Sequence, residues 1–317
     1  MDVQLRAITS VSVLLMLILG LMMFKRFGLL AEEHGRLCSA LITKVTLPAL
    51  ICVTLIHAEF SWEYPKMTAL LMGASVVGLG LGWLVSRAFH LDGPSTAPVV
   101  LACGFSSSTV LGVSLIGELF PGREAEVAET IVLSSLGMIP FVITGGTMIA
   151  MYYGASEMTP RERRRATLAY FRSPIFVSIL AGVALAFLAD HEGSVAHSFL
   201  DGLRLVSAGN TLMVLLTVGL LVEVQDLRGI VGLASCVAVV NLLVLPLLVL
   251  GPAHAMDLPH WTIEVLTLEA AMPAVMLPVV LCHEYGANGR LGAKLVLATI
   301  TASVFTIPLV FQIGSWL

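Results

Sequence analysis

The sequence predicts an all-α polytopic membrane protein with ten transmembrane helices. Of its 317 residues, 57% are hydrophobic and only 12% are charged, and the mean hydropathy is +0.96. Soluble domains contain about a quarter charged residues. A helix that spans a bilayer needs about 20 mostly apolar residues, and the chain supplies ten such windows. They leave no stretch for a soluble domain, and nothing in the chain suggests a nucleic-acid surface.

Turn and cap residues, such as Asp92-Gly93-Pro94 and Gly251-Pro252, separate these windows. The first window is followed by Lys25-Arg26. A secretory signal peptide has its basic residues before the apolar stretch, so we interpret this window as the first membrane helix. The ten windows cover approximately residues 8–24, 38–57, 67–88, 97–119, 128–153, 173–190, 203–222, 229–250, 261–283 and 293–315.

The basic residues predict the orientation, because cytoplasmic loops carry an excess of lysine and arginine. Twelve of them fall on one side of the predicted helices and four on the other, while Lys44 falls inside a helix. This asymmetry predicts a plasma (bacterial inner) membrane protein with both termini outside the cytoplasm and the "RERRR" loop, residues 161–165, inside.

The two halves of the chain resemble each other. "GELFPGREAEVAETIVLSS" (117–135) follows a serine-rich break, and "HEYGANGRLGAKLVLATI" (283–300) follows a proline-rich one. We therefore predict a five-helix repeat over residues 1–153, a basic cytoplasmic linker over 154–172, and a second repeat over 173–317. Because five is odd, the second repeat is inverted in the membrane. Interrupted helices at matching positions of such repeats point to the binding site of a secondary transporter.

The two interrupted windows are the candidate substrate site. In "LEAAMPAVMLP" (268–278), Pro273 and Pro278 each remove a backbone donor and free the carbonyl four residues earlier. Such a segment must be buried in protein or line a wet cavity. In "CGFSSSTVLGVS" (103–114), serine and threonine hydroxyls can bond to freed backbone groups or to a ligand. An alternative is a pair of kinked helices whose small residues serve only packing. The predicted substrate-binding residues are Ser106, Ser107, Ser108, Thr109, Gly112, Ala271, Met272, Pro273, Ala274 and Pro278.

Four further polar residues lie inside the predicted helices. A carboxylate within the membrane is a functional candidate because its burial is costly, so we expect Glu269 to hold a coupling proton or sodium ion, or else to bond to the broken backbone. Lys44 can meet a substrate carboxylate or extend to the membrane surface. Asn210 and Asn241 either join helices or reach a cavity.

The ninth-window sequence resembles the auxin efflux carrier family, which includes plant auxin exporters and bacterial malate and malonate permeases. The motif is Ala270-Ala271-Met272-Pro273, then Pro278, then His283-Glu284-Tyr285-Gly286. "VTLPAL" (45–50), "TVLGVSLIGELFP" (109–121) and "SAGNTLMVLLTVGLLVEVQ" (207–225) resemble the second, fourth and seventh helices of that family.

This resemblance implies ten helices in two inverted repeats. Helices 1, 2, 6 and 7 would form a scaffold that also makes a homodimer. Helices 3–5 and 8–10 would form a mobile domain, whose fourth and ninth helices cross at the substrate site. Members move organic anions by an elevator-like shift of that domain. The fourth helix departs from the family pattern, because Ser106, Ser107 and Gly112-Val113-Ser114 stand where members usually have proline, asparagine and Gly-x-Pro.

Glu269 also departs from the plant members, which tend to have an uncharged amide there. "Glu269-Ala270-Ala271-Met272" is similar to an E-x-x-M motif that helps to bind sodium in the related bile-acid sodium symporters. The implied metal site is thus a sodium site near Glu269 and Met272. The five cysteines are scattered singly, without the C-x-x-C spacing of zinc or redox sites. We therefore expect no cofactor apart from a coupling Na⁺ or H⁺.

The predicted function is secondary transport of small carboxylates, and the expected partners are that anion and membrane lipid. One alternative is a sodium- or proton-coupled symporter of another organic solute. A second is an intramembrane serine protease, since Gly104-Phe105-Ser106-Ser107 resembles the G-x-S start of rhomboid proteases. A serine nucleophile needs an adjacent base, and all eight histidines lie in loops or near helix ends. We therefore expect a transporter and not an enzyme.

Overall fold

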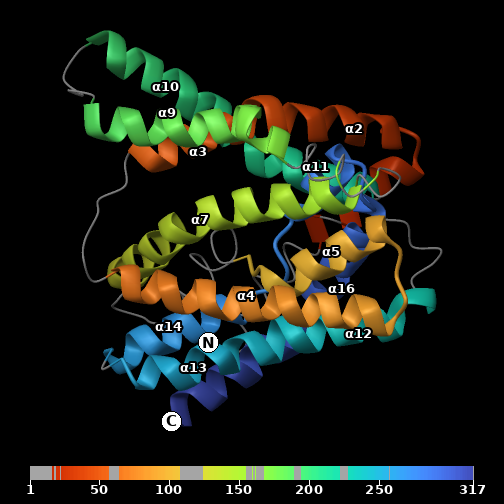
Figure 1. The fold of residues 1–317 in the computed structure, drawn as a ribbon, viewed down its shortest axis with the longest axis vertical. Helices are drawn as coiled ribbons and strands as arrows, with labels where there is room; N and C mark the ends of the chain where they lie inside the picture. The colour runs from red at the N-terminus through yellow and green to blue at the C-terminus, as the bar shows by residue number, and fades with distance from the viewer. Residues whose placement is uncertain are drawn as a thin grey trace.

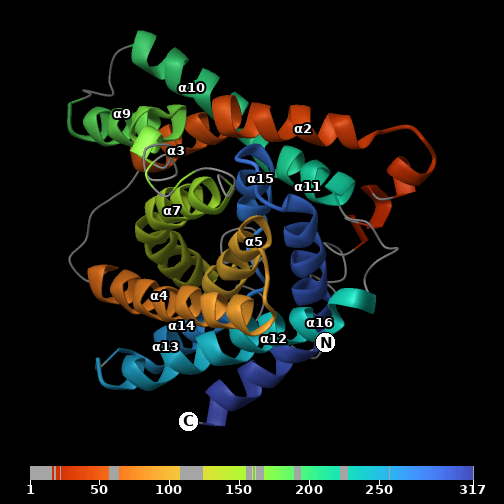
Figure 2. The same ribbon diagram turned by 45° about the vertical axis from the view of Figure 1, so that its right-hand side comes forward.

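The computed structural model describes residues 16–17, 19–21, 23–56, 64–107, 124–154, 159, 161, 168–188, 194–221, 228–256 and 258–316. This part of the chain is mostly helical and contains no β-strand. Its helices pack as two groups, one above the other in Figures 1 and 2.

The first group joins segments from both halves of the chain. In it α3 packs against α9 and α10, and α2 packs against α11. Its elements are α2 (Glu32–Leu41), the π-helical turn η1 (Ile42–Thr46), α3 (Leu47–Ile56), η3 (Ala169–Arg172), α9 (Pro174–Leu188), α10 (Ser194–Ala208) and α11 (Asn210–Leu221).

The second group also draws on both halves. In it α4 packs against α5, α7 and α13, while α16 packs against α5, α12, α14 and α15. Its elements are α4 (Tyr64–Ala88), α5 (Gly93–Gly104), α7 (Glu124–Gly154), η5 (Arg228–Ile230), α12 (Val231–Val239), the π-helical turn η6 (Val240–Val244), α13 (Leu245–His254), α14 (His260–Ala270), α15 (Leu277–Glu284) and α16 (Gly289–Trp316).

The two groups meet chiefly through α15, and α16 and α7 add contacts to α11 and α9. The short helix α15 packs against α2, η1 and α11 of the first group, and α7 packs against α9. Figure 1 shows α7 between the two groups, with α4 and α14 below it. A buried apolar core extends across this junction, from Ile42 and Ile51 to Phe105 and Val280.

Five helical stretches in the described part are long and apolar enough to cross a membrane. They are Glu33–Val53, Lys66–Ala88, Leu200–Leu221, Val231–His254 and Gly289–Phe311, and Pro174–Leu185 is a shorter apolar helix. Large apolar side chains also face outward on them, for example Leu205 at 79% exposed and Phe305 at 77% exposed. Such exposure suits contact with lipid, because a monomer in water rarely exposes large apolar patches.

Several expected boundaries are wrong in detail. The second helical stretch begins at Glu32 and not at residue 38, and the seventh is divided at Gly209 into α10 and α11. Lys294, one of the twelve basic residues on the predicted cytoplasmic side, is only 8% exposed and lies within α16. Pro278 does not interrupt a helix, because it is the second residue of α15. Proline is favourable there, since the first helical N–H groups have no partner within the helix.

Candidate functional site

The two predicted breaks lie side by side and are hydrogen-bonded to each other. Helix α5 ends at Gly104 and α14 ends at Ala270, and the segments beyond them form an isolated antiparallel bridge between Ser106 and Ala274. The Ser107 N–H donates to the Pro273 carbonyl (2.8 Å), and the Val275 N–H donates to the Phe105 carbonyl (3.1 Å). We call residues 105–107 together with 271–276 the crossing. The backbone groups released by one break therefore partly satisfy those released by the other.

One side chain of the crossing and two from other helices brace it. The Ser106 hydroxyl donates to the Ala270 carbonyl (3.0 Å), at the end of α14. Asn241 in η6 donates from Nδ2 to Ser106 Oγ (3.2 Å), and Thr299 Oγ1 in α16 accepts from the Ala274 N–H (3.2 Å). Asn241 and Thr299 are fully buried. The geometry of the crossing is thus determined by η6 and α16 as well as by the sequence of the crossing itself.

Glu269 occupies the last turn of α14 and is 2% exposed. Its carbonyl, which we expected Pro273 to leave free, accepts from the Met272 N–H at 3.3 Å, so that expectation is wrong. Ala271 and Met272 are fully buried beside it. The carboxylate therefore lies within the protein, next to the carbonyl end of a helix, where a positive charge is favoured.

The other candidates lie in different places. Asn210 begins α11 and accepts from the Thr46 hydroxyl (2.8 Å), which joins two elements of the first group. Lys44 Nζ in η1 lies 3.6 Å from Glu284 Oε1, and the Lys44 side chain is 64% exposed. Glu284 is at the end of α15 that lies farther from the crossing. Of the three polar candidates, Asn241 is the one whose hydrogen bonds are at the crossing. Ser108, Thr109 and Gly112 lie outside the described residues.

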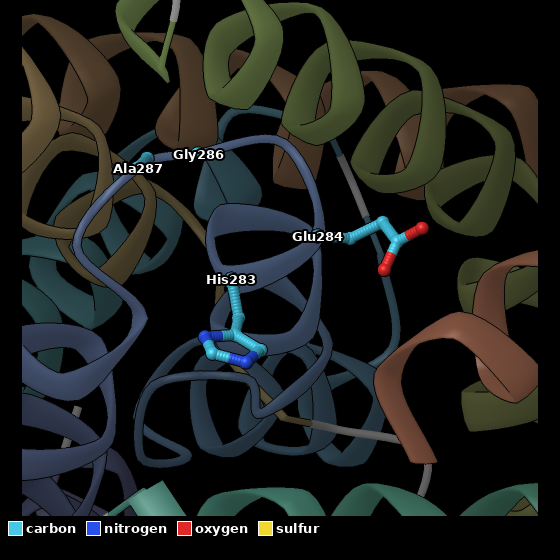
Figure 3. A pocket seen from close by; sticks show the side chains of 4 residues that line it. All are labelled: His283, Glu284, Gly286 and Ala287. Atoms are coloured by element: carbon cyan, nitrogen blue, oxygen red, sulfur yellow. The ribbon is translucent and has the colours of Figure 1, made fainter. Parts of the chain in front are cut away.

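A cavity of about 350 Å³ lies at the end of α15. The described residues that line it are His283, Glu284, Gly286 and Ala287. In Figure 3 the side chains of His283 and Glu284 project in different directions from this end of the helix. The turn that follows is closely packed: a Cβ at Gly154 would collide with the Tyr285 carbonyl, and Gly286 has a positive φ of 81°. The Lys44–Glu284 pair therefore borders a cavity at the junction of the two groups.

Sequence reasoning missed two buried hydroxyls. Thr299 supports the crossing, and Ser39 in α2 donates to the Val280 carbonyl of α15 (3.1 Å), across the junction of the groups. Each is a single small hydroxyl residue with apolar neighbours in the chain, Cys38 and Ala40 for Ser39 and Ala298 and Ile300 for Thr299. Their hydroxyls also resemble those of many helical residues that bond within their own helix, so no sequence signal distinguishes them.

Several apolar helices and a pair of broken helices buried between them are the architecture of a membrane transport protein. Accordingly, the profile of a protein family described as membrane transport protein matches residues 7–311. The chain belongs to this family, the auxin efflux carrier family, and the resemblance in its ninth-window sequence is confirmed. It is therefore a multi-pass membrane transporter.

Two archaeal relatives are similar to the chain over almost its whole length. An uncharacterized transporter of Methanothermobacter thermautotrophicus is 25% identical over 310 residues, which cover 95% of this chain and 96% of the relative. The uncharacterized transporter MJ1031 of Methanocaldococcus jannaschii is 22% identical over 303 residues, which cover 94% and 96%.

Proposed function

We propose that this transporter carries small organic anions, with the crossing as its substrate site. The observation that carries the proposal is the pairing of Ser106 with Ala274, which brings two helix breaks together inside an apolar protein. Helix α15 begins three residues after Ala274, and in the described structure no side chain caps its N-terminus. The N–H groups at a helix N-terminus favour a carboxylate.

The opposite ends of broken helices supply the coupling site in this proposal. Helices α5 and α14 both end at the crossing, so their carbonyl ends give it a negative potential on that side. Glu269 adds a carboxylate in the last turn of α14. A proton or a sodium ion is the natural ligand there, while the anion binds at the α15 end.

Ser106 is better placed to form part of the proposed substrate site than to act as the nucleophile of a protease. Its hydroxyl donates to the Ala270 carbonyl, and its oxygen accepts from the Asn241 amide. Neither partner is a base, whereas a serine nucleophile needs one within hydrogen-bond reach. A Ser106→Ala variant that lost cleavage of a membrane protein would favour the protease alternative.

The deciding experiment is uptake by purified protein in proteoliposomes. A panel of mono- and dicarboxylates is tested with and without a sodium gradient and a pH gradient. We expect saturable uptake of at least one carboxylate, absent from protein-free liposomes. Failure to transport or bind any organic anion would contradict the proposal.

Glu269→Gln tests the coupling role. The amide preserves the shape of the side chain and removes its charge, so we expect uptake to lose its dependence on the coupling ion. Glu264→Gln is the matched control, because Glu264 lies on the same helix but is only partly buried. If the ion dependence of Glu269→Gln matched that of the wild type, Glu269 would have a structural role only.

The excess of basic residues supports an orientation with both termini outside. A cysteine introduced at Arg161, which is exposed, should then react with a membrane-impermeant thiol reagent in inside-out vesicles alone. Reaction in right-side-out vesicles would reverse this orientation.

A further inference from the structure

Asn241 lies in an unusual stretch of backbone. The turn η6, Val240–Val244, is π-helical and separates α12 from α13. A π-helical turn is a rare insertion into an α-helix and is frequent at functional sites. Here it carries the one residue of η6 with a polar side chain, and that side chain is fully buried and bonded to the crossing.

The hydrogen bonds determine how the Asn241 amide is turned. Ser106 has one hydroxyl proton, which it donates to the Ala270 carbonyl, so its oxygen must accept from Asn241. Nδ2 therefore faces Ser106, and Oδ1 faces away from it. Oδ1 is buried and has no hydrogen-bond partner among the residues that the structure describes.

Such an acceptor is costly to bury, so it calls for a ligand. The hydroxyls of Thr147 and Thr306 also lack a partner within the described part, but a hydroxyl can rotate toward a carbonyl of its own helix. The Asn241 amide has no such freedom, because Ser106 holds its other end. A carboxylate would not satisfy Oδ1, since both groups are acceptors. The missing partner must be a donor.

We propose that Asn241 Oδ1 is the specificity-determining acceptor of the transport site and receives a hydrogen bond from a hydroxyl of the substrate. The carrier would then prefer hydroxylated carboxylates over counterparts that lack the hydroxyl. This inference rests on the proposed function. Leu277, at the start of α15, comes only three residues after Ala274, the partner of Ser106. That segment spans at most about 11 Å, which keeps the N-terminus of α15 near the crossing. In this proposal the substrate places its carboxylate at α15 and its hydroxyl at Asn241.

The test compares pairs of substrates that differ by one hydroxyl: malate with succinate, and lactate with propionate. In proteoliposomes of the wild-type protein, we expect the hydroxylated member of a transported pair to have a KM at least about tenfold lower. A site built to bond a substrate hydroxyl discriminates strongly against the analogue without it. Asn241→Leu, of similar size but with no acceptor, should bring the KM ratio close to one. Loss of the bond to Ser106 affects both members of a pair, whereas loss of Oδ1 weakens only the hydroxylated one.

Asn210→Leu is the control, since Asn210 is also buried but bonds to Thr46 in the first helix group. It should leave the ratio unchanged. The ratio of two substrates within one variant does not depend on how much protein is folded, so a loss of stability cannot imitate the result.

Each other outcome has a definite meaning. Transport of carboxylates with equal KM values in the wild type overturns this inference and leaves the proposed function standing. An unchanged ratio in Asn241→Leu, together with an altered sodium dependence, also overturns it and assigns Oδ1 to a coupling cation. Absence of transport for every carboxylate overturns both the inference and the proposed function.

Discussion

Single hydrogen bonds decide whether the broken segments hold their shape, and Thr299 shows this most clearly. Its Oγ1 donates to the Val296 carbonyl (2.9 Å) and accepts from the Ala274 N–H (3.2 Å). Without it, the N–H next to Pro273 would be buried and unsatisfied. An unsatisfied buried group costs about 1–3 kcal/mol.

We therefore expect Thr299→Val, which has nearly the same shape, to destabilise the protein by about 1–3 kcal/mol and to lower substrate affinity. Thr299→Ser should restore most of both. Thr301→Val is the control, because Thr301 bonds to Leu297 in the same helix but is exposed. Thermal unfolding in detergent and substrate binding are the measurements. Equal effects at positions 299 and 301 would show that the bond to Ala274 has no special weight.

At the scale of the helices, the close packing of α4 against α5 depends on two glycines of α4. Gly78 and Gly82 are four residues apart on α4, and their missing side chains let the backbone of α5 approach. A Cβ at Gly78 would lie 2.6 Å from the Cys103 carbonyl oxygen, and one at Gly82 would lie 2.8 Å from the Val100 Cα. This spacing of small residues is common where membrane helices pack closely. It positions the end of α5, and so the crossing.

Gly78→Ala and Gly82→Ala should each destabilise the protein by about 1–3 kcal/mol, the usual cost of overpacking. Gly80→Ala lies between them and should be harmless, because no atom comes within 4 Å of its added Cβ. The midpoint of thermal aggregation, followed by size-exclusion chromatography, reports the difference. If all three variants behaved alike, close approach of α4 and α5 would not be the reason for these glycines.

At the scale of the whole molecule, the polar contacts between the two helix groups bear on the mechanism. The Ser39 hydroxyl reaches the Val280 carbonyl, and Lys44 pairs with Glu284. Ser39 and Lys44 are five residues apart, and the π-helical turn η1 lies between α2 and α3 at this point. Their partners are four residues apart on α15. Both contacts would separate if the second group moved as a body.

An elevator-like movement can thus be tested by joining the groups. In a background without native cysteines, Lys44→Cys with Glu284→Cys is treated with a short bifunctional thiol reagent. We expect linking to stop transport while substrate binding persists. The control pair is Asp201→Cys with Arg204→Cys, which are exposed neighbours on α10. Full transport after linking positions 44 and 284 would contradict a movement at this junction.

Sequence alone established a helical membrane protein, its family and the location of its two breaks. Apolar windows indicate the membrane helices, because lipid excludes unsatisfied backbone. Pro273 marks one break, since proline cannot continue a helix, the serine-rich stretch after Gly104 marks the other, and the ninth-window motif indicates the family. The structure departs from these predictions locally. Pro278 lies in the first turn of α15 instead of interrupting a helix, and the residues of the two π-helical turns have no distinctive composition that would predict them.

Tertiary structure decided how the breaks are used. Ser106 bonds to Ala270, 164 residues away, and to Asn241, 135 residues away. The residue types alone do not distinguish Asn241 from Asn210, or Thr299 from Thr301; the members of each pair differ in their place in the fold and in the group that lies opposite. The identity of a polar partner is a property of helix packing, because a buried hydroxyl or amide takes its role from whichever backbone group comes within about 3 Å of it.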